Sequence, residues 1–309
     1  MRIVVLTPVT EEQRSRLEAA APDAAFVFSS HAGVTADELA EAEIVVGNVA
    51  PARLREAPKL RFLQLDSAGF DSYAKAPLPD GLVMANASGC YGPAVSEHML
   101  AMLLGMMKRL PAYRDDQRAH VWRWEGHART LDGANVLVLG AGDIGTHFAR
   151  LVVALGAHVA GCRRHAERND PPFERMLSLD EVRSHLGEFD VVASALPSTP
   201  ETRGLADDAF FSSMREGSFF VNAGRGDLVD QDALVCALTS GHLAGAALDV
   251  CVPEPLPVDD PLWDTPNLLL TPHQAGRFNV PATLDKIIAL SAKNIERFLR
   301  GEDPINRFH

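Results

Sequence analysis

The feature that most constrains this chain is a glycine motif near its middle. The apolar run Val136–Leu139 leads directly into Gly140-Ala-Gly142-Asp-Ile-Gly145, and Thr146–Leu155 follows with helical patterning. A strand, a tight turn and a helix N-terminus in this order form a cradle for a dinucleotide. The first glycine allows the turn, the second lets the backbone approach a pyrophosphate, and the third lets helix and strand pack closely. The free N–H groups of the helix then face the phosphates. A glycine-rich turn can also be merely structural, but the flanking strand and helix favour a bound cofactor.

Length and charge narrow the remaining possibilities. With 309 residues the chain exceeds a comfortable single core, so we expect two domains. The net charge of −12 argues against nucleic acid or an anionic membrane as a main partner. Met1–Leu6 has the pattern of a first strand rather than of a secretion signal, and the apolar stretches are interrupted too early to span a bilayer. The four cysteines lie far apart without a C-x-x-C pair, so we expect no disulfide framework, no metal site and a reduced, cytoplasmic protein.

Apolar β-forming segments alternate with helical segments along the chain. Strands separated by helices imply parallel sheets covered on both faces, and therefore an α/β fold. Before the glycine motif we expect strands at Arg2–Leu6, Phe26–Phe28, Ile44–Val46, Leu60–Leu65 and Val83–Ala85. We expect helices there at Glu11–Ala20 and Thr35–Ala42. After the motif we expect strands at His158–Cys162, Asp190–Ala195, Ser218–Asn222, Gly245–Asp249 and Asn267–Leu270. We expect helices there at Asp207–Met214 and Gln231–Ser240.

Three further segments decide how the two units are connected. Ala94–Arg109 is a long apolar helix that we expect to connect the domains, and its methionines are typical of core packing. Pro111–Gly133 is polar and aromatic, so we expect an extended arm that contacts a second subunit. Lys286–Leu299 is an amphipathic helix that should return to the first domain and make it discontinuous. We therefore expect one domain of residues 1–97 and 278–309 and another of residues 98–277.

Polar side chains follow three strands of the second unit, at the strand ends where such sheets bind ligands. The segment Asn-x-x-Arg225-Gly closes one strand, and the guanidinium of Arg225 can hold a carboxylate bidentately. Asp249 ends the next strand, and Glu254 lies between two prolines that stiffen its backbone. His273 follows the last strand. Near a carboxylate its imidazole would be oriented and its pKa raised, which suits an acid or base near neutral pH. Taken singly, Arg225 could be a surface ion pair and His273 a packed core histidine.

Taken together, these motifs resemble those of the D-isomer-specific 2-hydroxyacid dehydrogenases. The resemblance rests on the glycine motif, Asn-x-x-Arg225-Gly, Asp249-x₄-Glu254-Pro and Thr-Pro-His273 in this order, and it covers nearly the whole chain. Residues 196–205, Leu-Pro-x-Thr-Pro-Glu-Thr-x-Gly-Leu, are a further family signature. The resemblance implies two Rossmann-like domains with parallel sheets, the nucleotide-binding domain inserted into a discontinuous substrate domain, and a homodimer. It also implies reduction of a small 2-oxo acid to a D-2-hydroxy acid by NAD(P)H.

The family's roles carry over to the matching positions. The resemblance implies that Arg225 binds the carboxylate of the 2-oxo acid and polarises its carbonyl, and that His273 donates a proton to the carbonyl oxygen. It also implies that Glu254 pairs with His273. In the first domain, Ser-Ala68-Gly69-Phe-Asp matches the family loop whose N–H groups receive the substrate carboxylate. Ala68 and Gly69 are therefore assigned to the substrate, together with Arg225 and His273.

The same resemblance assigns the cofactor. Asp249 is expected to hold the nicotinamide carboxamide, with help from the backbone of Ala223. The residues expected at the cofactor are Gly140, Gly142, Asp143, Ile144, Gly145, Arg163, Arg164, Leu196, Pro197, Thr202, Ala223, Asp249, His273, Ala275 and Gly276.

The end of the second strand of this unit bears on the kind of nicotinamide. NAD specificity normally needs an acidic residue there, about 20 residues past the glycines, to bind the ribose diol. Strand His158–Cys162 instead ends in Arg163 and Arg164, and the nearest acids, Glu167 and Asp170, come later. An arginine pair suits a 2′-phosphate, so we favour NADP(H), with NAD(H) possible if both arginines are only solvated charges.

The sequence also bears on the substrate and on an alternative function. The related formate dehydrogenases carry a glutamine where this chain has Glu254, so reduction of glyoxylate or hydroxypyruvate fits better than formate oxidation. Side-chain specificity should depend on residues whose arrangement the sequence does not give, namely Asn48–Arg53, Phe70, Trp122, Trp124, Arg277 and Phe278. A nucleotide-sensing regulatory protein of the same fold is the alternative function, because the family includes corepressors that keep these residues.

Overall fold

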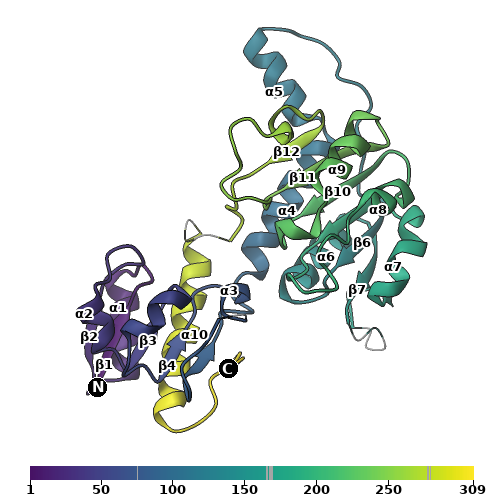
Figure 1. Cartoon of the computed structure of the whole chain (residues 1–309). Helices are drawn as coiled ribbons and strands as arrows, with labels where there is room; N and C mark the ends of the chain where they lie inside the picture. The colour runs from purple at the N-terminus through teal and green to yellow at the C-terminus, as the bar shows by residue number, and fades with distance from the viewer. Residues whose placement is uncertain (75, 165, 167–169, 277, 279) are drawn as a thin grey trace. The chain divides into compact units, whose positions relative to one another are not determined.

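The chain divides into two units, each built on its own sheet (Figure 1). The computed structural model describes residues 1–309 except 75, 165, 167–169, 277 and 279. Unit 1 comprises Met1–Tyr91 and Phe278–His309, and unit 2 comprises Gly92–Arg277. The boundary falls at Gly92 rather than at the expected residue 98, so the long apolar helix belongs to unit 2 from its first residue. Arg277 and Glu167, which the sequence analysis singled out, lie outside the described residues.

Unit 1 is a five-stranded sheet in the order β2-β1-β3-β4-β5, with every pair parallel. This is the doubly wound 2-1-3-4-5 order. Its strands are β1 (Arg2–Val5), β2 (Ala25–Phe28), β3 (Ile44–Val46), β4 (Phe62–Gln64) and β5 (Val83–Ala85). Its helices are α1 (Glu11–Ala20), α2 (Ala36–Ala40), the 3-10 helix η1 (Pro51–Glu56), α3 (Asp71–Ala74) and α10 (Pro281–Leu299).

Alternation along the strands produces a hydrophobic core on each face of this sheet. In β1, Ile3 and Val5 join the cluster that α1 and α10 cover, whereas Val4 joins the opposite cluster. Side chains of successive strand residues point to opposite faces, so apolar residues at every position require cover on both sides. The chain's last helix is tied to the sheet by a buried 2.7 Å hydrogen bond from Asn294 to Gln64. The returning C-terminal segment is therefore part of unit 1.

Unit 2 is a seven-stranded parallel sheet in the order β12-β11-β10-β9-β6-β7-β8. The strand order reverses between β6 and β9, which makes this the topological switch point of a Rossmann sheet. Its strands are β6 (Asn135–Leu139), β7 (His158–Cys162), β8 (Arg175–Leu177), β9 (Val191–Ser194), β10 (Ser218–Asn222), β11 (Leu243–Leu248) and β12 (Leu268–Leu270). Its helices are α4 (Gly92–Met107), α5 (Leu110–Ala119), α6 (Asp143–Ala154), α7 (Leu179–His185), η2 (Leu186–Glu188), α8 (Asp208–Ser213), η3 (Gly226–Leu228), α9 (Gln231–Thr239) and η4 (Pro261–Asp264).

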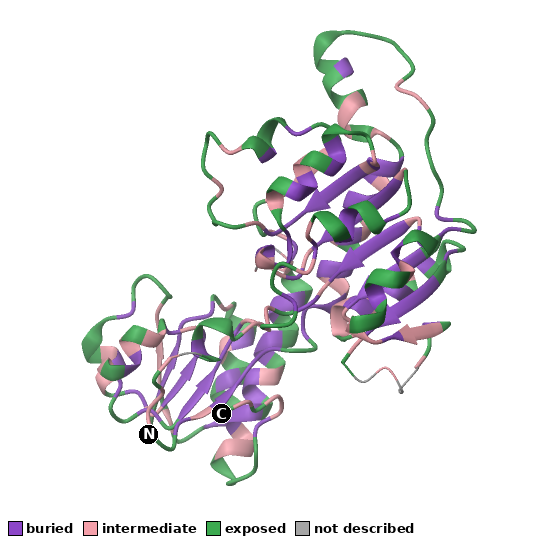
Figure 2. Ribbon diagram, turned by 45° about the vertical axis from the view of Figure 1, so that its right-hand side comes forward, coloured by how far each residue is buried: buried purple, intermediate pink, exposed green. Residues whose placement is uncertain are grey.

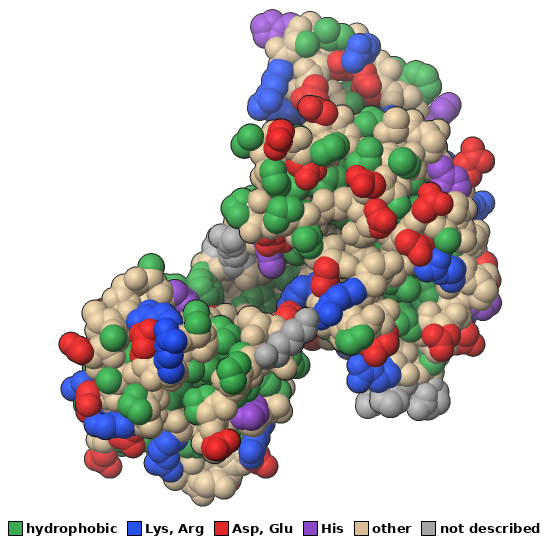
Figure 3. Space-filling view, in the orientation of Figure 1, with side chains coloured by type: hydrophobic (Ala, Val, Ile, Leu, Met, Phe, Trp, Pro, Cys, Tyr) green, Lys and Arg blue, Asp and Glu red, His purple; other side chains and the backbone are tan. Residues whose placement is uncertain are grey.

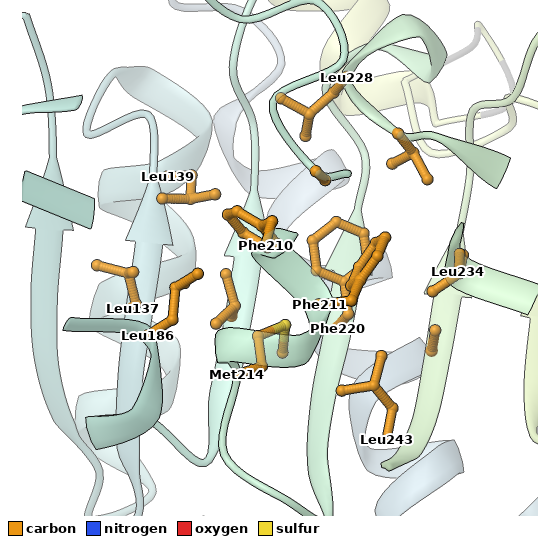
Figure 4. Packing of buried hydrophobic residues seen from close by; sticks show 14 of the residues in the cluster. Leu137, Leu139, Leu186, Phe210, Phe211, Met214, Phe220, Leu228, Leu234 and Leu243 are labelled. Atoms are coloured by element: carbon orange, nitrogen blue, oxygen red, sulfur yellow. The ribbon is translucent and has the colours of Figure 1, made fainter. Parts of the chain in front are cut away.

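The strands of unit 2 are buried along most of their length (Figure 2). Helices α7, α8 and α9 pack on one face, and α4 and α6 pack together on the other. Phe210, Phe211 and Phe220 meet edge to face at the centre of the first of these cores, with ring centroids 5.3–6.3 Å apart (Figure 4). This geometry is the preferred one for aromatic pairs. The packing fixes β10 and hence the loop that follows its carboxyl end.

The α/β class and the two parallel sheets that the sequence predicts are confirmed. The expected arm at Pro111–Gly133 is wrong in its first half, where α5 stands at the top of unit 2 in Figure 1. Pro111 lies in the first turn of α5, where a missing N–H costs nothing. The strand β8 and helix α7 were not expected, and α10 begins at Pro281 rather than at Lys286.

The sequence analysis argued against nucleic acid, a membrane and a metal ion as partners, and three features of the structure concern these expectations. Acidic and basic side chains are interspersed over the face shown in Figure 3. Among the described residues, none of the helices combines the length and the hydropathy needed to cross a membrane. The described part of the chain also contains no cluster of three or more His, Cys, Asp or Glu side chains arranged to hold a metal ion.

Candidate active site

The glycine motif forms a tight turn between β6 and α6. Gly140 has a φ of +97°, and a Cβ at this position would lie 3.1 Å from the carbonyl of Ala195, at the end of β9. The N–H groups of Gly140 and Ala141 both donate to the carbonyl of Cys162 at 3.0 Å, which fixes the turn to the end of β7. A Cβ at Gly145 would lie 2.0 Å from the Gly140 carbonyl oxygen. Glycine is therefore required at the first and third positions for different reasons.

The second glycine faces open space. A Cβ at Gly142 would meet no atom within 4 Å, and Gly142 is the N-cap of α6 with no side-chain cap. An uncapped helix start leaves N–H groups without partners, and these attract an anion. The side chain of Asp143 is turned to α4, where its carboxylate accepts a 2.8 Å hydrogen bond from the N–H of Gly92. The helix start, including the backbone of Asp143 and Ile144, thus fits a pyrophosphate.

The carboxyl end of β7 carries the two arginines expected at the ribose. Arg163 is partly buried and Arg164 is exposed. A guanidinium nitrogen of Arg163 lies 3.7 Å from a carboxylate oxygen of Asp170, and its buried Nε has no hydrogen-bond partner among the described residues. Arg163 therefore keeps a hydrogen-bond donor that no described residue uses, and Arg164 is a solvent-exposed cation.

The loop after β9 packs against the glycine turn. The hydroxyl of buried Thr202 donates to the carbonyl of Pro197 at 2.7 Å and accepts from the N–H of Thr199 at 2.8 Å. Thr202 therefore shapes the loop that presents Leu196 and Pro197. A Cβ at Gly224, in the next loop, would lie 2.5 Å from the carbonyl oxygen of Leu196, so the loops after β9 and β10 touch through their backbones.

The buried side chain of Asn222 explains the Asn-x-x-Arg pattern. Its amide nitrogen donates to the carbonyl of Arg225 at 2.8 Å, and its amide oxygen accepts from the N–H of Gly224 at 3.0 Å. This pair of bonds closes the loop and places the partly buried Arg225, which also donates to the Gly224 carbonyl at 2.8 Å. Ala223 donates its N–H to Ser194, whereas its carbonyl accepts no hydrogen bond from any residue that the structure describes.

Asp249 organises the segment that carries the histidine. Its side chain is 2% exposed and accepts three hydrogen bonds, from the Thr271 hydroxyl at 2.6 Å and from the N–H groups of Gln274 and Ala275 at 2.8 and 3.1 Å. The backbone carbonyl of Asp249 accepts from the N–H of His273 at 2.8 Å. The carboxylate thus fixes the path of residues 271–275, and Gly276 follows at its end.

His273 and Glu254 form a hydrogen-bonded pair. Nδ1 of His273 and Oε2 of Glu254 are 2.8 Å apart, and the two side chains are 46% and 37% exposed. The other oxygen of Glu254 accepts a 3.2 Å hydrogen bond from the N–H of Cys251. Since a carboxylate accepts, Nδ1 carries the proton of this bond, and Nε2 is the ring nitrogen that Glu254 does not contact.

One histidine that the sequence analysis did not single out joins this network. Nε2 of His98, on α4, lies 2.9 Å from the Thr271 hydroxyl. Because that hydroxyl donates to Asp249, it accepts from His98. Its only sequence signal is a polar residue within an apolar helix.

In unit 1, the expected substrate loop follows β4. The carbonyl of Ala68 accepts from the Asn86 side chain at 2.8 Å, and the carbonyl of Gly69 accepts from the Ser67 hydroxyl at 2.7 Å. The N–H groups of Ala68 and Gly69 donate to none of the residues described. With the carbonyls fixed and the amides unused, the loop offers two consecutive donors to an anion.

Comparisons with known proteins agree with this architecture. The family model described as "D-isomer specific 2-hydroxyacid dehydrogenase, NAD binding domain" matches residues 100–275. Glyoxylate/hydroxypyruvate reductase B of Pectobacterium carotovorum is 33% identical over 285 residues, which cover 85% of this chain and 84% of that protein. Against the D-3-phosphoglycerate dehydrogenase of Mycobacterium bovis, this chain spans only 42% of the relative's length.

Solved structures of related proteins match the fold of this chain over nearly its whole length. A D-isomer specific 2-hydroxyacid dehydrogenase family protein from Aeromonas salmonicida is 31% identical with a TM-score of 0.88, covering 100% of this chain and 98% of that one. A NADPH-dependent glyoxylate/hydroxypyruvate reductase from Sinorhizobium meliloti, in complex with NADP and sulfate, is 26% identical with a TM-score of 0.82, covering 99% and 98%. Because the family model matches more than half of the chain, this chain belongs to the D-isomer specific 2-hydroxyacid dehydrogenase family.

Proposed function

We propose that this protein is an NAD(P)H-dependent reductase that converts a small 2-oxo acid to a D-2-hydroxy acid. The observation that carries the proposal is the 2.8 Å pair of His273 and Glu254, at the same sheet edge as the loop of Arg225. An imidazole held by a carboxylate can donate a proton and accept it again, and an arginine can bind a carboxylate.

The glycine turn supports binding of the dinucleotide. The open space at Gly142 and the uncapped start of α6 fit a pyrophosphate, so residues 140–145 would hold it. The carbonyl of Ala223 and the carboxylate of Asp249 would receive the carboxamide, and Leu196, Pro197, Ala275 and Gly276 would line the same cofactor. When bound, the reduced nicotinamide supplies the hydride.

The chain's own residues handle the charge and the proton. Arg225 binds the substrate carboxylate and polarises the carbonyl, and the amides of Ala68 and Gly69 receive the carboxylate. Nε2 of His273 gives a proton to the carbonyl oxygen as the carbonyl carbon gains the hydride, so the 2-hydroxy acid leaves with both. Glu254 holds the imidazole in the correct orientation and stabilises its charged form before this transfer.

We further propose NADP(H) as the preferred cofactor. Arg163 and Arg164 stand at the end of β7 where a ribose-binding carboxylate is normally found, and the Nε of Arg163, which has no hydrogen-bond partner among the described residues, suits an added phosphate. The Sinorhizobium meliloti neighbour, which is NADPH-dependent, supports this choice. Replacing both arginines with alanine should raise the KM for NADPH by about tenfold or more while leaving that for NADH nearly unchanged. A preference of the wild-type protein for NADH would contradict the proposal that NADP(H) is the cofactor.

We also propose a homodimer. Trp122 and Trp124 follow α5 and are 103% and 69% exposed, which is unusual for large apolar side chains on a monomer. Replacing both with serine should shift the molecular mass measured by light scattering from dimer to monomer. A wild-type monomer would contradict the proposal.

The reductase proposal is tested by mixing the protein with NADPH and a panel of 2-oxo acids that includes glyoxylate and hydroxypyruvate. We expect the absorbance of the reduced cofactor to fall and a D-2-hydroxy acid to form. Tight cofactor binding without turnover of any acid would favour the nucleotide-sensing alternative.

A further inference from the structure

A second polar cluster lies at the carboxyl ends of the strands of unit 1, and of its members only Asn48 has been named above, among the residues expected to affect side-chain specificity. It consists of Thr7, His31, Asn48 and Asp66, which follow β1, β2, β3 and β4. The segment after edge strand β2 crosses the sheet edge, because Nε2 of His31 lies 2.8 Å from Oδ2 of Asp66. Ligands bind at this edge of doubly wound sheets.

Asp66 fixes the histidine ring. Its side chain is 4% exposed, and Oδ2 accepts from both the Thr7 hydroxyl at 2.9 Å and Nε2 of His31. A buried carboxylate needs such donors, because leaving one unpaired is costly. Phe278 stacks on the imidazole with ring centroids 6.3 Å apart and an angle of 14°. The ring is therefore held on one edge and one face.

The opposite edge of the ring is available. The side chain of His31 is 37% exposed, and its Nδ1 forms no hydrogen bond with any described residue. The hydrogen bond to Asp66 raises the pKa of His31, against a smaller opposing effect of burial, which favours a proton on Nδ1. In the protonated ring, Nδ1 is an N–H donor, and the buried carboxylate of Asp66 balances the positive charge.

This donor is connected to the loop that offers its amides to an anion. The Asn48 side chain donates to the Ser67 hydroxyl at 3.1 Å and accepts from the N–H of Asp66 at 3.2 Å. The N–H of Asn48 also points at Nε2 of His31, the ring nitrogen that faces Asp66, at 3.4 Å. Ser67 is followed directly by Ala68 and Gly69. A series of hydrogen bonds therefore links the imidazole to Ser67, the residue directly before the two unused amides.

We propose that His31 is a specificity-determining residue whose Nδ1 donates a hydrogen bond to a neutral oxygen, a hydroxyl or carbonyl, on the third carbon of the substrate. The inference rests on the proposed function, since it concerns the acid whose carboxylate Ala68 and Gly69 receive. A charge-balanced donor recognises a neutral acceptor better than a second full anion. The substrate class is therefore 2-oxo acids that carry an oxygen at C3.

The test compares hydroxypyruvate with pyruvate, which differ only in the hydroxyl on C3. We would measure kcat/KM for both with wild type, His31→Phe and His31→Gln. Phenylalanine keeps the stack on Phe278, and the glutamine amide can still reach Asp66, but neither has a donor at Nδ1. The ratio of kcat/KM for hydroxypyruvate to that for pyruvate should fall about tenfold in both variants.

Two controls separate this result from general damage. His158→Phe removes another histidine that is paired with a carboxylate. His158 is the first residue of β7 in unit 2, at the amino end of the strand, so this variant should leave the ratio unchanged. Glyoxylate has no third carbon, so its kcat/KM should not change in either His31 variant. An unchanged ratio, or equal losses with all three acids, would overturn the inference while the proposed function stands. If wild type reduces none of these acids, both fail. Should His31→Phe not fold, the ratio in His31→Gln alone decides.

Discussion

The hydroxyl of Thr271 donates a 2.6 Å hydrogen bond to the buried carboxylate of Asp249, and through it the segment carrying His273 is anchored to the end of β11. Nε2 of His98 donates to the same hydroxyl. The histidine is therefore positioned by a network that begins on α4, and not only by its partner Glu254.

Replacing Thr271 with valine should destabilise unit 2. Valine has nearly the same shape but removes one donor from a 2%-exposed carboxylate and the acceptor of His98. We expect the free energy of unfolding, measured with urea, to fall by about 1–3 kcal/mol. Thr271→Ser keeps the hydroxyl and should stay closer to wild type. Equal losses in the two variants would show that the hydroxyl does not matter.

The glycines of the motif should respond differently to alanine. A Cβ at Gly145 meets the Gly140 carbonyl oxygen at 2.0 Å, so Gly145→Ala should lower the free energy of unfolding by about 1–3 kcal/mol. A Cβ at Gly142 meets nothing within 4 Å, so Gly142→Ala should fold normally but weaken cofactor binding by about tenfold or more. Calorimetric titration with NADPH checks the second variant. Wild-type affinity in a folded Gly142→Ala protein would place the phosphates elsewhere.

Glu254→Gln tests the charge beside His273. The glutamine amide oxygen can still accept from the N–H of Cys251, but it no longer stabilises a positive imidazole. We expect kcat to fall by about 10- to 100-fold in steady-state assays. Glu174→Gln, which alters the carboxylate facing His158, is the matched control and should keep wild-type kcat. A Glu254→Gln enzyme with unchanged kcat would remove the carboxylate from the mechanism.

The pair of His31 and Asp66 should make stability depend on pH. Because the pKa of His31 is raised on folding, its contribution is fully present below the unfolded value of about 6.5 and is lost as pH rises through the higher folded value. Tyr73 and Tyr91 also face Asp66, but burial raises their pKa values above the usual range, so neither titrates there. The difference in unfolding free energy between wild type and His31→Phe should therefore shrink between pH 6 and pH 9, in buffers chosen around that reference value. A difference that grows with pH would contradict this.

The sequence predicted what local patterns determine. Apolar runs such as Ile44–Val46 gave strands with the expected bounds, and Gly140 and Gly145 stand where a tight turn and a close helix contact require glycine. The pairing of His273 with Glu254 followed from the family resemblance and not from spacing. In the structure both lie beyond strand ends that the parallel sheet brings to one edge.

The sequence did not predict contacts that depend on the tertiary fold. His31 meets Asp66 only because the segment after β2 crosses two strand ends, and His98 meets Thr271 only because α4 packs on the sheet. Neither histidine differs in sequence from a solvated or packed one. Helix α5 was missed because its second half, residues 114–118, is a run of polar side chains with no apolar periodicity. It is accompanied instead by the ion pair of Asp116 with Arg123, at 2.9 Å.

The most direct test of the account is the effect of His273→Ala on turnover and on cofactor affinity. With NADPH and hydroxypyruvate, we expect kcat to fall by at least about 100-fold while the Kd for NADPH, measured by fluorescence titration, stays within about twofold of wild type. Wild-type turnover in this variant would show that His273 is not the proton donor. Loss of turnover and cofactor binding together would show that it is a structural histidine.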